Sequence, residues 1–176
     1  MKMDLNSILD KRSKKSQLIL ISGESGSGKT TWCKEQIAIV QQKGLKVAGV
    51  LSPAIFESGE KVGIALINLA TGEKRQLAKL RPQLQPEAII KKWIMDPEVI
   101  VWANGCLEKV KTCDLLIIDE LGPLEFKTKE GFQKAFSLIE EENYRLAVVV
   151  IRPALLLMAS ERWQGIPSQI YHIEEI

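Results

Sequence analysis

A glycine-rich stretch near the N-terminus constrains the fold of this chain more than any other feature. Residues 17–31 read QLILISGESGSGKTT, which is an apolar run, a glycine-rich turn and the start of an amphipathic segment. The turn has the pattern G-x-x-x-x-G-K-T, in which glycines let successive backbone N–H groups converge on a phosphate. The helix that follows adds N–H groups and the positive end of its dipole. The stretch therefore predicts a polyphosphate-binding loop between a buried strand and a helix.

The residue types in this loop predict a role for each position. The Lys29 ammonium is expected to reach β- and γ-phosphate oxygens, which makes it a predicted catalytic residue. The Thr30 hydroxyl is expected to be a magnesium ligand. The predicted phosphate-binding residues are Gly23, Glu24, Ser25, Gly26, Ser27, Gly28, Lys29, Thr30 and Thr31.

A second informative stretch, residues 113–125, reads CDLLIIDELGPLE. Its consecutive apolar residues predict a fully buried strand that ends in Asp119 and Glu120. A carboxylate at the tip of such a strand is what a phosphate-binding loop needs nearby to hold magnesium, so Asp119 is a predicted Mg²⁺ ligand. Glu120 is the next residue of the strand, so its side chain is expected to point away from that of Asp119. We predict that it orients or deprotonates an attacking water molecule.

Arg152 directly follows another predicted buried strand, residues 145–151. It therefore lies at the carboxyl edge of the sheet, the side on which ligands bind in folds of this class. Two interpretations stay open. Arg152 either neutralises transition-state charge as a catalytic residue, or forms an ion pair with a loop carboxylate.

The other segments predict one α/β domain over residues 17–176, preceded by a flexible leader at 1–16. Residues 46–51 predict a second buried strand, which completes a first β-α-β unit. Turn residues then predict an antiparallel β-insert at about 53–78. Helices are predicted over residues 29–43, 87–95, 98–110, 129–143 and 154–163, and a last strand over 169–173. We expect Trp93 and Trp102 to pack in the core.

Composition excludes several classes of partner. A net charge of +2 and the lack of a basic stripe with interleaved aromatic residues argue against nucleic-acid binding. No apolar run is long enough to span a membrane, and the N-terminus lacks a signal peptide. The three cysteines contain no C-x-x-C pair, so reduced thiols and a cytoplasmic location are expected.

Taken together, these motifs resemble the small nucleoside-triphosphatase family of thermophilic bacterial NTPases and the vertebrate cancer-related nucleoside-triphosphatase. The resemblance is carried by GESGSGKTT at 23–31, GVLSP at 49–53, the hairpin at 63–72 and DELGPLE at 119–125. It covers nearly the whole chain after the leader. Many relatives have IGKME where this chain has LGPLE at 121–125, and Glu125 stays a candidate for the cleft.

The resemblance implies a single RecA-like P-loop domain with a mostly parallel sheet, flanking helices and a hairpin insert. It also implies slow, magnesium-dependent hydrolysis of several nucleoside triphosphates to diphosphate and phosphate. Base selectivity is predicted to be loose, because no N-K-x-D segment follows the acidic strand. Two alternatives stay open: a small-molecule or nucleotide kinase with the insert as acceptor pocket, and a nucleotide-gated switch without enzymatic activity.

Overall fold

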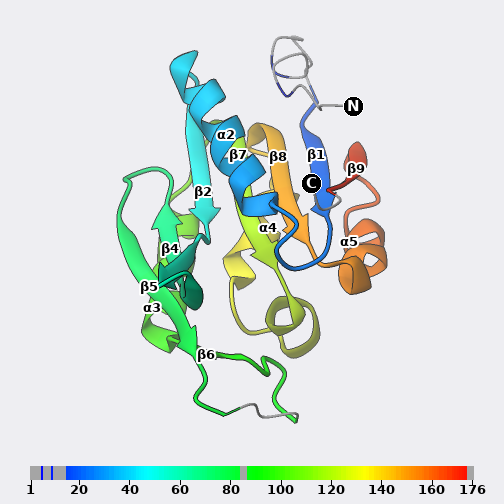
Figure 1. Ribbon diagram of the computed structural model, residues 1–176. Helices are drawn as coiled ribbons and strands as arrows, with labels where there is room; N and C mark the ends of the chain where they lie inside the picture. The colour runs from blue at the N-terminus through cyan, green and yellow to red at the C-terminus, as the bar shows by residue number, and fades with distance from the viewer. Residues whose placement is uncertain (1–4, 6–8, 10–14, 84–86, 174–176) are drawn as a thin grey trace.

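The structure is a computed structural model that describes residues 5, 9, 15–83 and 87–173. Parallel strands form the centre of its sheet (Figure 1). They are β1 (Gln17–Ser22), β2 (Val47–Leu51), β7 (Cys113–Leu121), β8 (Tyr144–Ile151) and β9 (Ser168–His172). They lie in the order β2-β7-β8-β1-β9, and every neighbouring pair is parallel. The predicted β-α-β unit therefore joins two strands that are not neighbours, since β7 and β8 lie between β1 and β2.

The predicted antiparallel insert continues the same sheet instead of forming a separate layer. Its strands are β3 (Ala54–Glu57), β4 (Glu60–Asn68), β5 (Lys74–Leu80) and β6 (Trp93–Met95). β4 pairs antiparallel with β2, and β5 and β6 extend the sheet outward, while β3 pairs with β4 alone. The expected α/β class with a mostly parallel central sheet is confirmed.

Helices cover both faces of the sheet. They are α2 (Lys29–Gln42), α3 (Pro97–Glu108), the π-helix η1 (Leu124–Thr128), α4 (Gln133–Glu140), the 3₁₀-helix η2 (Pro153–Leu155) and α5 (Leu156–Arg162). One core cluster contains α2 residues and the alternate strand residues Ile19 and Ile21. The other contains α3, α4 and α5 residues with Leu18 and Leu20. Because consecutive strand residues point to opposite faces, an unbroken apolar run fills both cores.

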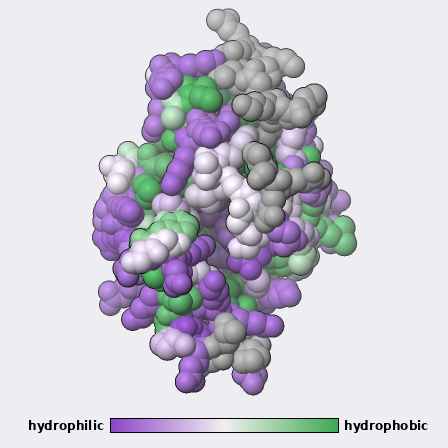
Figure 2. Space-filling view, in the orientation of Figure 1, coloured by the Kyte–Doolittle hydropathy of each residue, from purple (hydrophilic) through white to green (hydrophobic). Residues whose placement is uncertain are grey.

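The described helices include none that is both long and apolar enough to cross a membrane. Figure 2 shows one face of the molecule, which is mostly hydrophilic, with hydrophobic residues visible in small separate groups.

The prediction of a helix over residues 87–95 is wrong. Turns and bends occupy residues 87–92, and β6 follows. The Arg81 N–H donates to the Lys92 carbonyl at 2.9 Å, and residues 93–95 pair with the outer edge of β5. A helix this short is marginal without an apolar face to bury, whereas the open edge of β5 supplies backbone hydrogen bonds at once.

The helix predicted from residue 129 begins later in the structure. α4 begins at Gln133 and not at residue 129, because Lys129 and Gly131 have φ values of 56° and 68° that interrupt a helix.

Trp102 packs against the core as expected. Trp93 does not, since it is half-buried and lines a cleft described below.

Most of the predicted leader, residues 1–16, lies outside the described residues. Leu5 and Leu9 are helical and only 1% and 3% exposed, and both belong to the core cluster on the α2 face. The Arg145 guanidinium donates a hydrogen bond to the Leu9 carbonyl. At these two positions the chain is part of the core, which differs from the flexible leader predicted for residues 1–16.

A substitution at Gly49 can test how closely β2 packs against β7. Its φ is +106°, and a Cβ atom there would lie 1.9 Å from the Ile117 carbonyl oxygen. We expect Gly49→Ala to lower the free energy of unfolding by about 3 kcal/mol or more, as backbone strain and overlap combine. The matched control is Gly105→Ala within α3, where an added Cβ atom would meet nothing within 4 Å apart from its chain neighbours and the backbone of its own helix. That change should raise stability by about 0.5–1 kcal/mol. Urea unfolding measures both, and equal stability of the two variants would contradict the packing described.

Candidate active site

The carboxyl ends of the parallel strands meet at one edge of the sheet, where the structure has a cleft of about 350 Å³. The loop after β1, the acidic end of β7 and Arg152 after β8 all line it. Because these strands are parallel, segments far apart in the sequence come together here. The predicted phosphate loop and the predicted metal ligand thus share one cleft.

The loop from residue 23 to 28 connects β1 to α2 with a backbone suited to anions. Gly26 and Gly28 both have φ of 91°, a conformation that residues with a side chain rarely adopt. Gly28 is the N-cap of α2 and makes no side-chain capping bond. The N–H groups of the first helical turn therefore point toward the cleft without competition from a cap.

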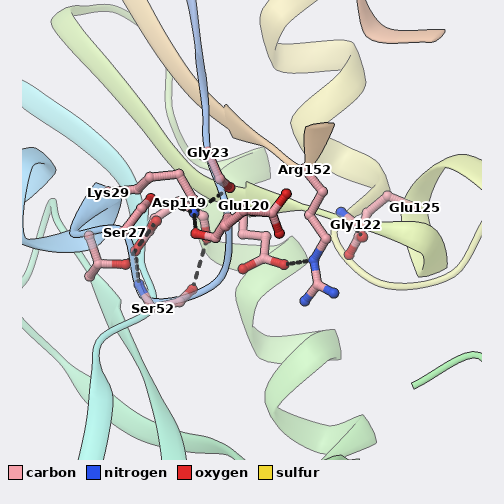
Figure 3. Close-up of polar contacts among 11 residues, drawn as sticks. Gly23, Ser27, Lys29, Ser52, Asp119, Glu120, Gly122, Glu125 and Arg152 are labelled. Atoms are coloured by element: carbon pink, nitrogen blue, oxygen red, sulfur yellow. Dashed lines mark hydrogen bonds and ion pairs between the residues drawn. The ribbon is translucent and has the colours of Figure 1, made fainter. Parts of the chain in front are cut away.

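The Lys29 side chain folds back across the loop (Figure 3). Its ammonium donates to the carbonyls of Gly23 and Glu24 at 2.7 and 2.5 Å, and to Ser27 Oγ at 3.3 Å. Burial lowers the pKa of Lys29, while the negative charge of Glu120 opposes that shift. These contacts fix a cation at the mouth of the loop.

Asp119 lies beside the first turn of α2. Its Oδ1 accepts from the Thr30 hydroxyl at 3.3 Å, and its Oδ2 accepts from the Ser52 N–H at 2.9 Å. The Ser52 hydroxyl also donates to the Asp119 carbonyl at 3.1 Å. Burial raises the pKa of this carboxyl, and the bonds from Ser52 and Thr30 act in the opposite direction.

Thr30 and Asp119 fit a magnesium site. Within the described residues no group of three or more His, Cys, Asp or Glu side chains forms a complete metal centre. Protein magnesium sites usually need only one or two side-chain oxygens, because water and substrate phosphates supply the rest. A hydroxyl and a carboxylate oxygen 3.3 Å apart beside an anion-binding loop meet that requirement.

The two acids lie at a β-bulge. The register between β7 and β8 shifts between Ile118 and Leu121, so that one extra residue is placed on β7. Glu120 has a φ of 78°, and both Asp119 and Glu120 line the cleft. The Arg152 Nε donates to Glu120 Oε1 across the cleft (Figure 3). Of the two interpretations of Arg152, the structure thus shows the ion pair with a carboxylate, and its partner is the residue predicted to act on water.

Glu125 lines the cleft, yet both of its carboxylate oxygens bind backbone. Oε2 accepts from the Gly122 N–H at 2.8 Å and Oε1 accepts from the Phe132 N–H at 3.0 Å. The residue is 7% exposed, and burial raises its pKa. Glu125 thus connects the end of β7 to the start of α4, and we assign it a structural role.

The loop positions differ in their access to the cleft. Those that line it are Ser25, Gly26, Gly28, Lys29, Thr30 and Thr31. Gly23 and Glu24 contribute the carbonyls that bind Lys29, and the Ser27 N–H closes the turn by donating to the Glu24 carbonyl at 3.2 Å.

Several residues of the cleft were missed from the sequence, among them Ser52, Lys61 and Trp93. Ser52 follows a predicted strand, so its presence at the carboxyl edge would have been predictable with the strand order. Lys61 lies in a hairpin strand whose distance from the loop no local pattern encodes. Trp93 was assigned to a helix that does not form.

Comparisons with known proteins agree with this geometry. A family model described as NTPase matches residues 18–174. The nucleoside-triphosphatase THEP1 of Thermococcus kodakarensis is 30% identical over 134 residues, which are 74% of this chain and 74% of the relative. That of Pyrococcus abyssi is 32% identical over 134 residues, which are 75% of this chain and 73% of the relative.

Two solved structures share the fold. A human cancer-related nucleoside triphosphatase superposes with a TM-score of 0.66 at 16% identity, and the match covers 89% of this chain and 88% of that one. THEP1 from Aquifex aeolicus gives a TM-score of 0.57 at 17% identity, with 89% and 90% covered.

The structural role of Glu125 predicts a loss of stability when it is truncated. Glu125→Ala should lower the free energy of unfolding by about 2–4 kcal/mol, because two buried N–H groups lose their acceptors. Glu125→Gln should cost less, since one acceptor remains. The exposed Glu35→Ala on α2 serves as the control and should change stability by less than about 0.5 kcal/mol. Equal unfolding midpoints for the Glu125→Ala and Glu35→Ala proteins would instead return Glu125 to the candidates for catalysis.

Proposed function

The chain belongs to the NTPase family whose model it matches, and from this premise we propose that it binds a nucleoside triphosphate with Mg²⁺ and hydrolyses it to diphosphate and phosphate. It is a nucleoside-triphosphate phosphohydrolase. One observation carries the assignment of its site: Thr30 at the start of α2 and Asp119 at the end of β7 meet through their side-chain oxygens, 3.3 Å apart. An anion-binding loop and a carboxylate in contact are the two elements that phosphoryl-transfer sites of this class combine.

We assign binding of the phosphates to the loop and to Lys29. The amides after Gly28 donate to the phosphate oxygens, and the Lys29 ammonium neutralises the charge that develops on the terminal phosphate. The ammonium donates to two loop carbonyls and to Ser27 Oγ, so it exchanges at least one of these bonds for a phosphate oxygen when nucleotide binds. Thr30 and Asp119 are the proposed magnesium ligands. A bound magnesium ion supplies positive charge beside the β- and γ-phosphate oxygens.

Glu120 is the proposed group that orients the attacking water. Its Oε1 accepts from Arg152, and the described residues provide no hydrogen-bond donor for its Oε2. Oε2 can then accept a proton from water at the terminal phosphate. The pair with Glu120 matches the second interpretation of Arg152, in which it forms an ion pair with a carboxylate. A role of Arg152 in neutralising transition-state charge stays a prediction.

The remaining expectations concern base selectivity, cellular location and binding partners. No Asn or Gln side chain lines the described cleft, and its acidic side chains, Asp119, Glu120 and Glu125, have other proposed roles, so we propose loose base selectivity. We also propose that the substrate is a free nucleotide in the cytoplasm, with neither nucleic acid nor membrane as partner. The kinase alternative predicts that label from a γ-labelled triphosphate ends in an added acceptor and not in free phosphate.

Magnesium dependence and base selectivity are tested together. Phosphate release from ATP, GTP, CTP and UTP should occur at rates within about tenfold of one another with Mg²⁺. Excess EDTA should abolish release, and added Mg²⁺ should restore it. A triphosphate that binds about a hundredfold more tightly than the others would contradict loose selectivity.

The role of Glu120 is tested by Glu120→Gln. We expect kcat to fall by about 10²- to 10³-fold, because the amide cannot accept the proton, while the Kd for a non-hydrolysable analogue changes little. The matched control is Glu57→Gln on β3, an exposed carboxylate outside the cleft lining, which should leave kcat unchanged. Negligible turnover of the unsubstituted protein would favour the nucleotide-gated switch.

A further inference from the structure

The cleft continues beyond Asp119 and Glu120 into a second region, which we call the outer half. Its walls come from the antiparallel strands β3 to β6 and are largely apolar. The apolar side chains are Phe56, Ile64, Leu77, Trp93 and Met95. Neither the phosphate groups nor the attacking water gain from an apolar wall of this kind, so phosphoryl transfer to water does not account for it.

Strand order places the outer half on the far side of the terminal phosphate. The loop follows β1, and Asp119 and Glu120 end β7, whereas β4, β5 and β6 lie beyond β2 in the sheet. A triphosphate held by the loop with its last phosphate at Asp119 occupies the space between β1 and β7. The outer half is thus separated from the loop by the reacting phosphate and is not needed to hold the phosphate chain.

Positive charge gathers in this outer half. The Lys61 ammonium lies 5.1 Å from the centroid of the Trp93 ring, and the Lys92 ammonium lies 5.5 Å from it. Lys61 lines the cleft and is half-buried, and burial lowers its pKa while Glu120 opposes that shift. Among the described residues Lys61 has no carboxylate within ion-pair distance. Arg152, by contrast, is already paired with Glu120.

A half-buried cation that makes no direct ion pair can bind an anionic partner. The aromatic and aliphatic side chains around it favour an apolar body attached to that anion. Phe56 lines the cleft and is 63% exposed, so its ring is accessible to a molecule bound there.

We propose that the outer half binds a second small molecule, with an aromatic body and one phosphate or carboxylate group, beside the terminal phosphate of the nucleotide. Lys61 binds the anionic group, and Phe56 and Trp93 contact the body. The inference rests on the proposed function, since the nucleotide occupies the loop.

Calorimetric titration of the full chain tests the site. The protein is first saturated with Mg²⁺ and the β,γ-imido analogue of ATP, and then titrated with AMP or with 4-hydroxybenzoate. These two probes separate a phosphate from a carboxylate. At least one of them should bind with a stoichiometry of one and without displacing the analogue.

Variants assign that binding to the outer half. Lys61→Met should weaken binding of the probe by about tenfold or more, while Lys61→Arg should stay within about threefold of the unsubstituted protein. Lys74→Met on β5 is the matched control, because Lys74 is exposed and does not line the cleft, and it should have no effect. An unchanged affinity for the analogue shows that each variant is folded.

Three results would overturn the proposal: no binding of either probe, displacement of the analogue by the probe, or binding that Lys61→Met does not weaken. A large fall in kcat for Lys61→Met without any probe binding would assign Lys61 to the terminal phosphate instead. Affinity for the analogue alone is measured first, so failure of the proposed nucleotide site is seen separately.

Discussion

The contact between the first turn of α2 and the end of β7 is the constraint on which the site depends. The loop and the carboxylate belong to strands that are not neighbours, because β8 lies between β1 and β7. Their separation is therefore set by the width of the buried parallel sheet. Both faces of these strands are packed under helices, which leaves the strands little freedom to shift. The chemistry of the cleft is held by the core and not by the loops alone.

Keeping Asp119 in that position has an energetic cost that the surroundings offset. A buried carboxylate is unfavourable unless it is hydrogen-bonded, and here Ser52 and Thr30 bind both of its oxygens. At the bulge in β7 the adjacent acids Asp119 and Glu120 both line the cleft, and the positive φ of Glu120 is a strained backbone conformation.

Much of the fold followed from local patterns, and the exceptions have physical causes. Unbroken apolar runs such as residues 115–118 predicted buried parallel strands, and the pattern G-x-x-x-x-G-K-T predicted the loop and α2. Residues 87–95 were assigned to a helix because their spacing was helical, but pairing with β5 decided their structure. Strand order was not predictable, since it depends on contacts between distant segments. For that reason Asp119 was found from its motif, whereas Lys61, which has none, was not.

Two consecutive residues after β2 connect the halves of the cleft. Ser52 binds Asp119 through its N–H and its hydroxyl, and the carbonyl of Pro53 accepts from the Ala65 N–H in β4 at 2.8 Å. The peptide unit between Ser52 and Pro53 thus joins the antiparallel strands to the residue that binds Asp119. If a ligand of the outer strands shifts these bonds, it changes the affinity for nucleotide. By thermodynamic linkage, nucleotide then changes the affinity for that ligand by the same factor.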